Sequence, residues 1–373
     1  TTISWMGKDI KCVILKVVKK DCVLEPVTIC ETPGYNSYRR SATFLMLKAI
    51  YDLYTREEIG KVRVEFSVGT GYFCTLSGSV KTDDVFAKRV ESRMKELVAE
   101  EISITKEVVD TQEAIARFAE YGMDDKAGLF RYRRASKVNI YSIRGFQDYY
   151  YGYMVPNTSY LKWFALQPFE DGFVLQFPKM KEPAVVPAIS FSKKVFDALR
   201  KSEEWGKMLE LSTVGELNNL VSKGNLSEMI LVQEAIQEKQ IGDIAGMIAA
   251  DTSKRIIMIA GPSSSGKTTF SHRLSVQLRA HGLKPHPIAC DNYFVEREET
   301  PKDESGKPNF ECLGAVDVEL FNDHMNRLLA GETVEIPEFN FISGKKEYKA
   351  PTLPTKDINK QAKDYIALRK ISE

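Results

Sequence analysis

The sequence predicts a multidomain chain with an α+β region first, a helical connector in the middle and an α/β region with a parallel sheet last. In the first region, the expected strands are flanked by helices without a regular strand–helix alternation. Residues 176–190 contain three prolines, which mark a boundary. From residue 255 on, a short apolar strand, a glycine-rich turn, a helix and a second strand follow one another. This order indicates a parallel sheet.

The composition is that of an ordinary globular protein. The 373 residues carry 52 basic and 51 acidic side chains, so no bulk field draws the chain toward nucleic acid or an anionic membrane. No apolar run approaches the length of a membrane span, and the first residues lack the pattern of a secretory signal. The six cysteines form no C-x-x-C pair, and all four histidines follow residue 271. We expect a cytoplasmic protein without a disulfide framework, and no histidine-dependent site before that residue.

Hydrophobic periodicity predicts the elements of the first region in order. Alternating apolar and charged residues indicate short strands in residues 8–30, and a second alternation, broken by glycines, indicates strands between residues 62 and 75. Apolar residues at three- and four-residue steps predict helices over residues 41–54, 84–101 and 111–121. Residues 137–173 are dense in tyrosine and phenylalanine, which is typical of further strands.

The remaining chain is predicted in the same way. Residues 191–250 have a helical pattern, with helix starts at Thr213, where a glutamate three residues on completes a capping box, and at Ser227. The last region shows strands over residues 256–260 and 287–290 and helices over residues 267–281 and 317–330. Residues 356–373 have a charged, amphipathic, helix-like pattern. We find neither internal repeats nor a third apolar strand that ends in an acidic residue.

A phosphate-binding motif follows the strand at 256–260. Gly261-Pro-Ser-Ser-Ser-Gly-Lys-Thr268 matches G-x-x-x-x-G-K-[ST] at every fixed position. Its glycines let backbone N–H groups turn inward around an anion, and the next helix adds its positive dipole end. Lys267 would bridge the β- and γ-phosphates and Thr268 would coordinate Mg²⁺. The motif predicts binding of ATP or GTP by Gly261, Ser263, Ser264, Ser265, Gly266, Lys267, Thr268 and Thr269.

Asp291 is the first candidate for the chemistry of a phosphoryl acceptor. It follows the second strand of the last region, and ligands of open α/β sheets bind at the carboxyl ends of the strands. A carboxylate there can accept a proton from an attacking hydroxyl, with Lys267 as its catalytic partner at the phosphates. The same position also suits a helix cap or a Mg²⁺-shell aspartate.

Residues 256–348 resemble the uridine kinase and phosphoribulokinase group of P-loop kinases. The resemblance depends on the phosphate loop, on Asp291-Asn-Tyr-Phe, on Asn309-Phe-Glu311 with Ala315 and Asp317 downstream, and on Ile336-Pro-Glu-Phe-Asn-Phe341. It implies Mg²⁺-ATP as phosphoryl donor, Asp291 as general base for a ribose hydroxyl and Glu311 as the ligand of the sugar hydroxyls. The implied substrate contacts are Asp291, Tyr293, Glu311, Phe339 and Asn340.

The acceptor segment departs from the pattern of that group. Asn340 stands where nucleoside kinases usually carry aspartate, and Gly344 and Lys346 stand where histidine and arginine are more frequent. These departures bear on which nucleobase is recognised and do not affect the phosphoryl chemistry. Phe339 or Phe341 can stack on a base, a contact of about 1–3 kcal/mol, and both rings also suit core packing.

Residues 36–177 resemble the editing-type domain of threonyl- and alanyl-tRNA synthetases. The resemblance depends on Tyr38-Arg-Arg-Ser-Ala-Thr-Phe44, on residues 90–97 and on the segment from Asp148 to Lys162. Active editing domains hold a metal with an H-x-x-x-H pair, a cysteine and a histidine; here the corresponding positions are Arg40, Phe44, Tyr150 and Met154. Such residues make no zinc site, so the resemblance implies no editing hydrolysis. The tyrosines at 149–151 and 153 suit either a stacking pocket for a small ligand or nucleic acid, or a filled scaffold.

Together these features predict five segments. Residues 1–35 are the tail of a β-grasp-like domain, 36–177 the editing-like domain, 178–254 the connector, 255–350 a partial kinase domain and 351–373 a tail of open placement. This order is similar to that of fused bacterial nucleoside kinases. We expect ATP-dependent phosphorylation of a uridine- or cytidine-like nucleoside or similar small acceptor, in a chain that could form homo-oligomers. The alternative is a nucleotide-binding regulatory protein without turnover, whose synthetase-like half binds RNA or a small ligand. A mechanical P-loop ATPase lacks support, because no second ATP motif or sensor arginine follows.

Overall fold

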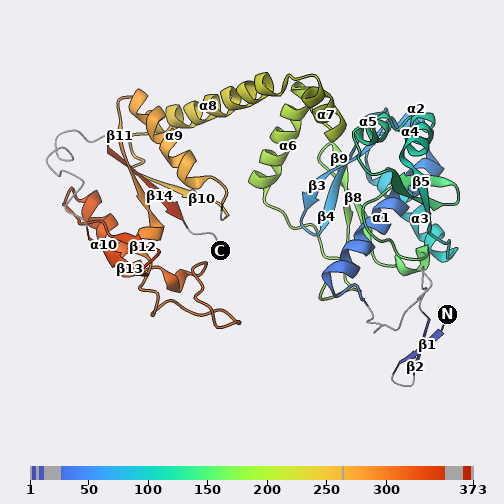
Figure 1. Cartoon of the computed structure of the whole chain (residues 1–373), viewed down its shortest axis with the longest axis horizontal. Helices are drawn as coiled ribbons and strands as arrows, with labels where there is room; N and C mark the ends of the chain where they lie inside the picture. The colour runs from blue at the N-terminus through green and yellow to red at the C-terminus, as the bar shows by residue number, and fades with distance from the viewer. Residues whose placement is uncertain (1, 6–7, 12–26, 263, 349–363, 371–373) are drawn as a thin grey trace. The chain divides into compact units, whose positions relative to one another are not determined.

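The computed structural model describes residues 2–5, 8–11, 27–262, 264–348 and 364–370, and in the first, second and last of these ranges only the backbone is considered. The chain divides into two compact units, Thr1–Gly224 and Asn225–Glu373, which we treat separately (Figure 1). None of the helices in the described ranges combines the length and the apolar character that spanning a bilayer requires.

The first unit is built from two antiparallel sheets and the helices around them. Its four-stranded sheet has the order β3-β4-β9-β8 and its three-stranded sheet the order β5-β6-β7. A short hairpin, β1 (Thr2–Trp5) with β2 (Lys8–Lys11), precedes them. The other elements are α1 (Thr32–Leu53), α2 (Arg56–Ile59), β3 (Val62–Val68), β4 (Gly71–Leu76), α3 (Asp84–Ala99), β5 (Thr105–Asp110), α4 (Thr111–Glu120), α5 (Asp124–Arg131), β6 (Lys137–Ile143), β7 (Phe146–Tyr149), β8 (Ala165–Phe169) and β9 (Gly172–Gln176).

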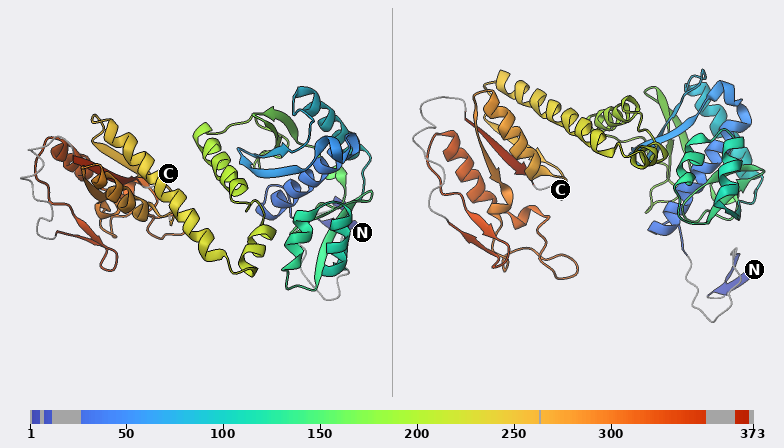
Figure 2. Two further views of the ribbon diagram at one scale, coloured as in Figure 1. Left: turned by 90° about the horizontal axis from the view of Figure 1, so that it is seen from above. Right: turned by 45° about the horizontal axis from the view of Figure 1, so that its top comes forward.

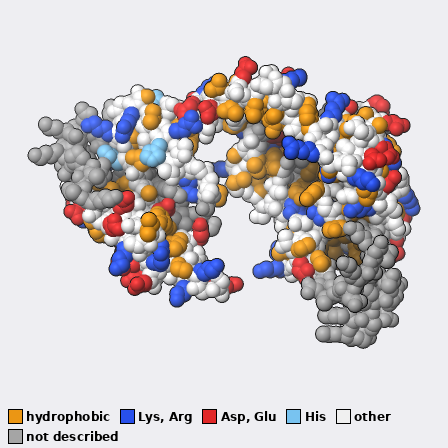
Figure 3. Space-filling view, in the orientation of Figure 1, with side chains coloured by type: hydrophobic (Ala, Val, Ile, Leu, Met, Phe, Trp, Pro, Cys, Tyr) orange, Lys and Arg blue, Asp and Glu red, His pale blue; other side chains and the backbone are white. Residues whose placement is uncertain are grey.

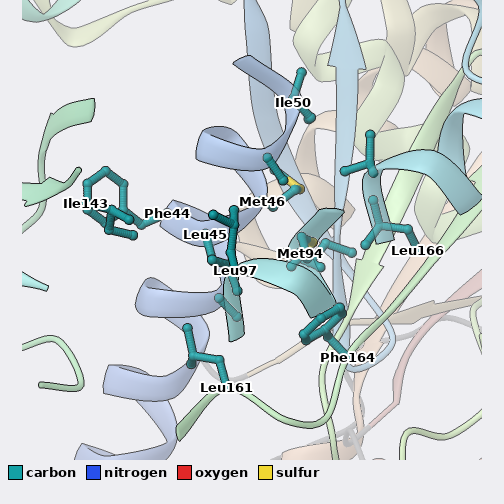
Figure 4. Close-up of a cluster of buried hydrophobic side chains, with 14 of the residues drawn as sticks. Phe44, Leu45, Met46, Ile50, Met94, Leu97, Ile143, Leu161, Phe164 and Leu166 are labelled. Atoms are coloured by element: carbon teal, nitrogen blue, oxygen red, sulfur yellow. The ribbon is translucent and has the colours of Figure 1, made fainter. Parts of the chain in front are cut away.

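The main core of this unit lies between helices α1 and α3 and the sheets. Figure 4 shows Leu45 and Met46 of α1 on the side of Met94 and Leu97 of α3, while Phe44 points the other way, toward Ile143 of β6. The opposite face of the four-stranded sheet carries a second, smaller cluster around Phe73, where Phe196 of α6 (Lys193–Met208) packs. Because the sheet is covered on both faces, all five residues of β9 are buried.

Of the strands predicted within residues 8–30, β2 is confirmed, residues 12–26 lie outside the described residues, and residues 27–30 form no strand. Most other elements predicted for the first unit are confirmed, with two differences. The helix predicted from residue 41 begins at Thr32, because Pro33 in its first turn suits the start of a helix even where apolar periodicity is weak. Strand β5 and helix α5 were not predicted. Of the six residues of β5 only Val109 is buried, so its sequence lacks the alternation that identifies a strand.

The helical stretch predicted from residue 191 to 250 is confirmed as α6, α7 (Val214–Ser222) and α8 (Leu226–Ala250). Thr213 caps α7 as predicted: its hydroxyl accepts from the Glu216 amide at 3.2 Å, while the Glu216 carboxylate accepts from the Thr213 amide at 2.8 Å. Helix α8 starts one residue before Ser227, after Asn225. Helices α6 and α7 belong to the first unit and α8 to the second.

The second unit contains a three-stranded parallel sheet of order β10-β14-β11. Helices α8 and α9 share one hydrophobic cluster with β10, and α10 packs with β11 in another, so helices lie on both faces (Figure 2). A small hairpin, β12 with β13, follows α10. The elements are β10 (Ile256–Ala260), α9 (Lys267–Ala280), β11 (Lys284–Ala289), α10 (Val318–Leu329), β12 (Glu338–Asn340), β13 (Lys345–Glu347) and β14 (Asp364–Lys370).

Strand β14 corrects two expectations. The helix-like tail predicted for residues 356–373 is wrong for residues 364–370, which form the central strand of the sheet; the remainder of that tail lies outside the described residues. The third strand that the sequence did not reveal is therefore supplied by the tail, and its last residues are Arg369 and Lys370 rather than an acid. Hydrogen bonding to a strand on each side satisfies both rows of backbone groups, which outweighs a local helical pattern.

Candidate functional site

The loop between β10 and α9 has the backbone of an anion-binding turn. Gly266, directly before the helix, has a φ of 82°, and Ser264 has a φ of 58°, both in the left-handed region. At Gly261 a Cβ atom would lie 2.8 Å from Ser265 Oγ, so a larger residue there would require the Ser265 hydroxyl to move. The predicted contact Ser263 lies outside the described residues. Glycines stand where the loop requires them, as the motif predicts.

The loop opens into the first turn of α9, a helix of 14 residues. Ser264, Ser265, Gly266, Thr268 and Thr269 are exposed, so the amides of this turn are accessible to an anion. Lys267 Nζ lies over the loop and donates to the carbonyl oxygens of Gly261 and Pro262, both at 2.7 Å. The loop thus presents a helix N-terminus and an ammonium group together, the combination that holds phosphate.

The register of the parallel sheet brings the phosphate loop and Asp291 to the same end of the sheet, at the carboxyl ends of its strands. Ala260 of β10 pairs with Lys370 of β14, and Ala289 of β11 pairs with Arg369 of β14. The carboxyl ends of β10 and β11 therefore lie level with each other, one on each side of β14. Two strand spacings separate their ends, about 10 Å. The half-buried Asp291 lies in the 3₁₀ turn Cys290–Tyr293 directly after β11. This end of the sheet is the one at which ligands of open α/β sheets bind.

Glu311 lies on a segment that runs beside the Asp291 turn. The Asp317 amide donates to the Tyr293 carbonyl at 2.8 Å, and the Val295 amide to the Ala315 carbonyl at 2.9 Å. Glu311 itself is exposed and precedes the short turn Leu313–Ala315. The structure therefore brings the segment that carries Glu311 next to the turn that carries Asp291.

Four phenylalanines cluster between that turn and the β12–β13 hairpin. Ring centroids of Phe294 and Phe339 are 5.6 Å apart, and those of Phe339 and Phe341 are 5.2 Å apart; Phe310 joins at 5.2 Å from Phe294. Phe339 is 4% exposed and Phe341 is 57% exposed. Of the two rings predicted to stack on a base, Phe339 packs in the core, while Phe341 presents an open face.

Asn340 is occupied within the hairpin. Its Oδ1 accepts from the amides of Ile342 and Ser343 at 2.9 and 3.2 Å, and its Nδ2 donates to Glu347 Oε1 at 2.6 Å. In this conformation Asn340 shapes the turn rather than facing a ligand. The glycine at 344 is explained by the same turn, because its φ is 73° and a Cβ there would lie 2.7 Å from the Cβ of Arg297.

An ion pair ties the hairpin to α10. Lys346 Nζ donates to Asp317 Oδ2, and the other carboxylate oxygen of Asp317 caps α10 by accepting from the Leu320 amide at 3.1 Å. Burial alone would raise the pKa of Asp317, but the hydrogen bonds from Lys346 and Leu320 outweigh it and lower this pKa. Sequence reasoning missed this pair, because the two residues are 29 positions apart and no local pattern marks them.

In the first unit, the positions of the editing metal site come together but are filled. Phe44 and Tyr150 are in ring contact at 5.4 Å, and Ser41 Oγ donates to Met154 Sδ at 3.3 Å. Arg40 Nη2 donates to the Tyr153 carbonyl at 2.9 Å. Burial raises the pKa of Tyr150 well above its ordinary value. Among the residues that the structure describes, no group of histidine, cysteine or acidic side chains is arranged to hold a metal.

The tyrosines of this segment do not share one pocket. Tyr150 is in the core, Tyr149 packs against Phe130 at 4.8 Å, and Tyr151 and Tyr153 are 85% and 65% exposed. On the face shown in Figure 3, acidic and basic side chains are interspersed over the described surface. The two exposed tyrosines, Tyr151 and Tyr153, are therefore open to solvent rather than part of a shared pocket.

No protein-family model matches this chain. A threonine–tRNA ligase of Francisella philomiragia is 30% identical over 153 residues, which cover 40% of this chain and 23% of the ligase. A uridine kinase of Vibrio vulnificus is 29% identical over 106 residues, which cover 28% of this chain and 49% of the kinase. A solved structure described as a possible uridine kinase from Bacillus stearothermophilus aligns with a TM-score of 0.28 and 23% identity, over 35% of this chain and 70% of that one.

The ligase and kinase similarities describe the architecture of the chain. The chain spans about a quarter of the ligases and about half of the uridine kinases that it matches. It joins a threonyl-tRNA synthetase-like N-terminal region to a uridine kinase-like region, as the sequence motifs predict.

Proposed function

We propose that this protein transfers the γ-phosphoryl group of ATP to a hydroxyl of a nucleoside or a similar small acceptor. One observation carries the proposal: the loop of the G-x-x-x-x-G-K-[ST] motif, with the Lys267 ammonium over it, follows one strand of the parallel sheet, and Asp291 follows another strand at the same end of the sheet. The matched uridine kinases support the acceptor class.

The donor side is assigned to the loop and the start of α9. Amides of residues 264–268 and the ammonium of Lys267 would hold the phosphates; Lys267 already lies within reach of the loop, as its 2.7 Å hydrogen bonds to two loop carbonyls indicate. Thr268, at the first turn of the helix, is the residue that would hold Mg²⁺ through its hydroxyl. When bound, Mg²⁺ neutralises charge on the phosphates.

On the acceptor side, Asp291 takes the proton. As the acceptor oxygen forms a bond to the γ-phosphorus, the bond to the β-phosphate oxygen breaks, the proton of the acceptor hydroxyl passes to Asp291, and ADP leaves. Glu311 would orient sugar hydroxyls. Phe341 offers a half-open ring to the base, whereas Tyr293, a substrate contact by resemblance, is fully buried and packs in the core instead.

The proposal is tested by ADP release from Mg²⁺-ATP over a panel of nucleosides and sugar alcohols. We expect one acceptor to stimulate release, and Lys267→Ala and Asp291→Asn each to lower the stimulated rate at least about 100-fold. Matched controls are Lys284→Ala, at the opposite end of β11, and Asp323→Asn, on the exposed side of α10. If the protein binds ATP but no acceptor stimulates release, the regulatory alternative replaces the kinase.

A further inference from the structure

Tyr293, two residues after Asp291, is the most completely enclosed residue of the proposed acceptor side. Its side chain is fully buried among Ile288, Met325 and Leu328, and its ring meets Phe321 edge-on at 5.1 Å. Both residues belong to the same 3₁₀ turn, so the buried Tyr293 ring anchors the turn from which Asp291 extends.

Two hydrogen bonds attach Tyr293 to helix α10. The Tyr293 hydroxyl lies 3.2 Å from Nδ1 of His324, which is itself only 5% exposed. The Tyr293 carbonyl accepts from the amide of Asp317, the residue that caps the same helix. Burial raises the pKa of the Tyr293 phenol and lowers that of His324, so near neutral pH both side chains are uncharged. The imidazole tautomer decides which of the two donates the hydrogen bond.

The same helix cap holds the acceptor hairpin. Asp317 pairs with Lys346 of β13, and β12 carries Phe339, whose amide faces Asn292 Oδ1 at 3.5 Å. A continuous path of contacts therefore leads from the hairpin through the start of α10 to Tyr293 and the Asp291 turn. Helix α10 therefore supports both Asp291, the proposed general base, and the aromatic cluster.

We propose that Tyr293 and His324 form a positioning pair that fixes the Asp291 carboxylate relative to the acceptor hairpin. The inference rests on the proposed kinase function and assigns to two buried residues a role that neither the motifs nor the relatives' names provide. Neither residue touches the substrate; both act by holding the turn from which Asp291 extends.

The test is a double-mutant cycle with a conservative rescue. Tyr293→Phe keeps the ring and removes the hydroxyl, and His324→Leu removes its partner. His324→Asn keeps an amide close to the position of Nδ1, and this amide can either accept from the phenol or donate to it. We expect Tyr293→Phe and His324→Leu each to lower kcat about 10- to 100-fold, because the Asp291 carboxylate is then misplaced. KM for ATP should stay unchanged, because the phosphate loop keeps its position. The double variant should lose no more than either single one, and His324→Asn should retain most of the wild-type kcat.

Tyr38→Phe is the matched control, because it also removes a buried phenol hydroxyl, one bonded to Trp163 in the first unit. We expect its kcat to equal that of the wild type. An unchanged kcat in Tyr293→Phe, or losses that simply add in the double variant, would overturn the positioning role.

A second readout separates this inference from the proposed function. Amide hydrogen exchange of residues 290–294 should accelerate in Tyr293→Phe and in His324→Leu and stay at the wild-type rate in Tyr38→Phe. If the wild type phosphorylates no acceptor, the kinase proposal fails, while faster exchange still supports the anchoring of the turn. Unchanged exchange contradicts the anchoring whatever the activity.

Discussion

Asn340 shows how one amide suits a position where a carboxylate would not. It accepts two backbone hydrogen bonds in the hairpin turn and donates one to Glu347, whose strand neighbour Glu338 is also acidic. An aspartate could accept the same two bonds but could not donate the third. The asparagine is therefore matched to Glu347, which explains a departure from the usual nucleoside kinase pattern.

We predict that Asn340→Asp destabilises the second unit by about 1 kcal/mol, because it places a third carboxylate beside Glu338 and Glu347. The measurement is thermal unfolding at neutral pH. The double variant Asn340→Asp/Glu347→Gln should regain most of the lost stability, since the amide can then donate to the new carboxylate. A single variant as stable as the wild type would contradict the assignment.

At the level of residues, the sequence predicts the donor side better than the acceptor side. The phosphate loop is a contiguous motif, and the left-handed backbone at Gly266 is what its glycine implies. The acceptor side depends on contacts between distant residues: Tyr293 with His324, and Asp317 with Lys346. Nothing in the local sequence distinguishes a tyrosine that packs in the core from one that binds a ligand.

Helix α6 illustrates how an element is held by both apolar and charged contacts. Phe196 packs within a cluster of phenylalanines on the face of the four-stranded sheet that carries Phe73. Arg200 pairs with Asp171 in the turn between β8 and β9. The hydrogen bond from Arg200 holds the pKa of Asp171 below its ordinary value. Asp171 is largely exposed, so this pair contributes below about 1 kcal/mol.

The lowered pKa of Asp171 gives a pH prediction with a definite sign. A depressed pKa in the folded state stabilises the protein above the ordinary carboxyl pKa of about 4, and this stabilisation is lost as pH falls through the folded value. Asp171→Asn should therefore accelerate hydrogen exchange of α6 at pH 7, and the difference from the wild type should be smaller at pH 3. A difference of equal size at both pH values would mean that the ion pair is not its cause.

At the level of elements, helices with strong periodicity are predictable and strands set by tertiary pairing are not. Helices α3, α4 and α10 follow their apolar spacing closely. Strand β14 does not, because its neighbours β10 and β11 determine its conformation from both sides. Strand β5, with one buried residue, is likewise determined by its pairing with β6 rather than by its own pattern.

The whole molecule consists of two units with separate hydrophobic cores, and only the second contains the phosphate loop. In the first unit, Arg40, Phe44, Tyr150 and Met154 stand at the positions that hold the metal in editing domains. We therefore expect nucleotide to act on one unit alone, since a ligand stabilises the folded unit that binds it.

We predict two thermal transitions, of which Mg²⁺-ATP raises only one, by about 4 °C or more at saturation. Phe44→Ala, in the first core, should lower the other transition and leave the nucleotide-sensitive one in place. Lys267→Ala should abolish the shift. Scanning calorimetry with and without Mg²⁺-ATP makes the measurement, and an equal rise in both transitions would contradict the independence of the units.

The central claim is that Asp291 removes a proton from an acceptor hydroxyl while the phosphate loop holds ATP. The most direct measurement is acceptor-dependent ADP release by the wild type and by Asp291→Asn, with the affinity for ATP determined on the same samples. The account predicts that Asp291→Asn retains wild-type affinity for ATP and loses at least about 99% of the acceptor-dependent rate. Acceptor-dependent release that persists in Asp291→Asn at the wild-type rate would contradict it.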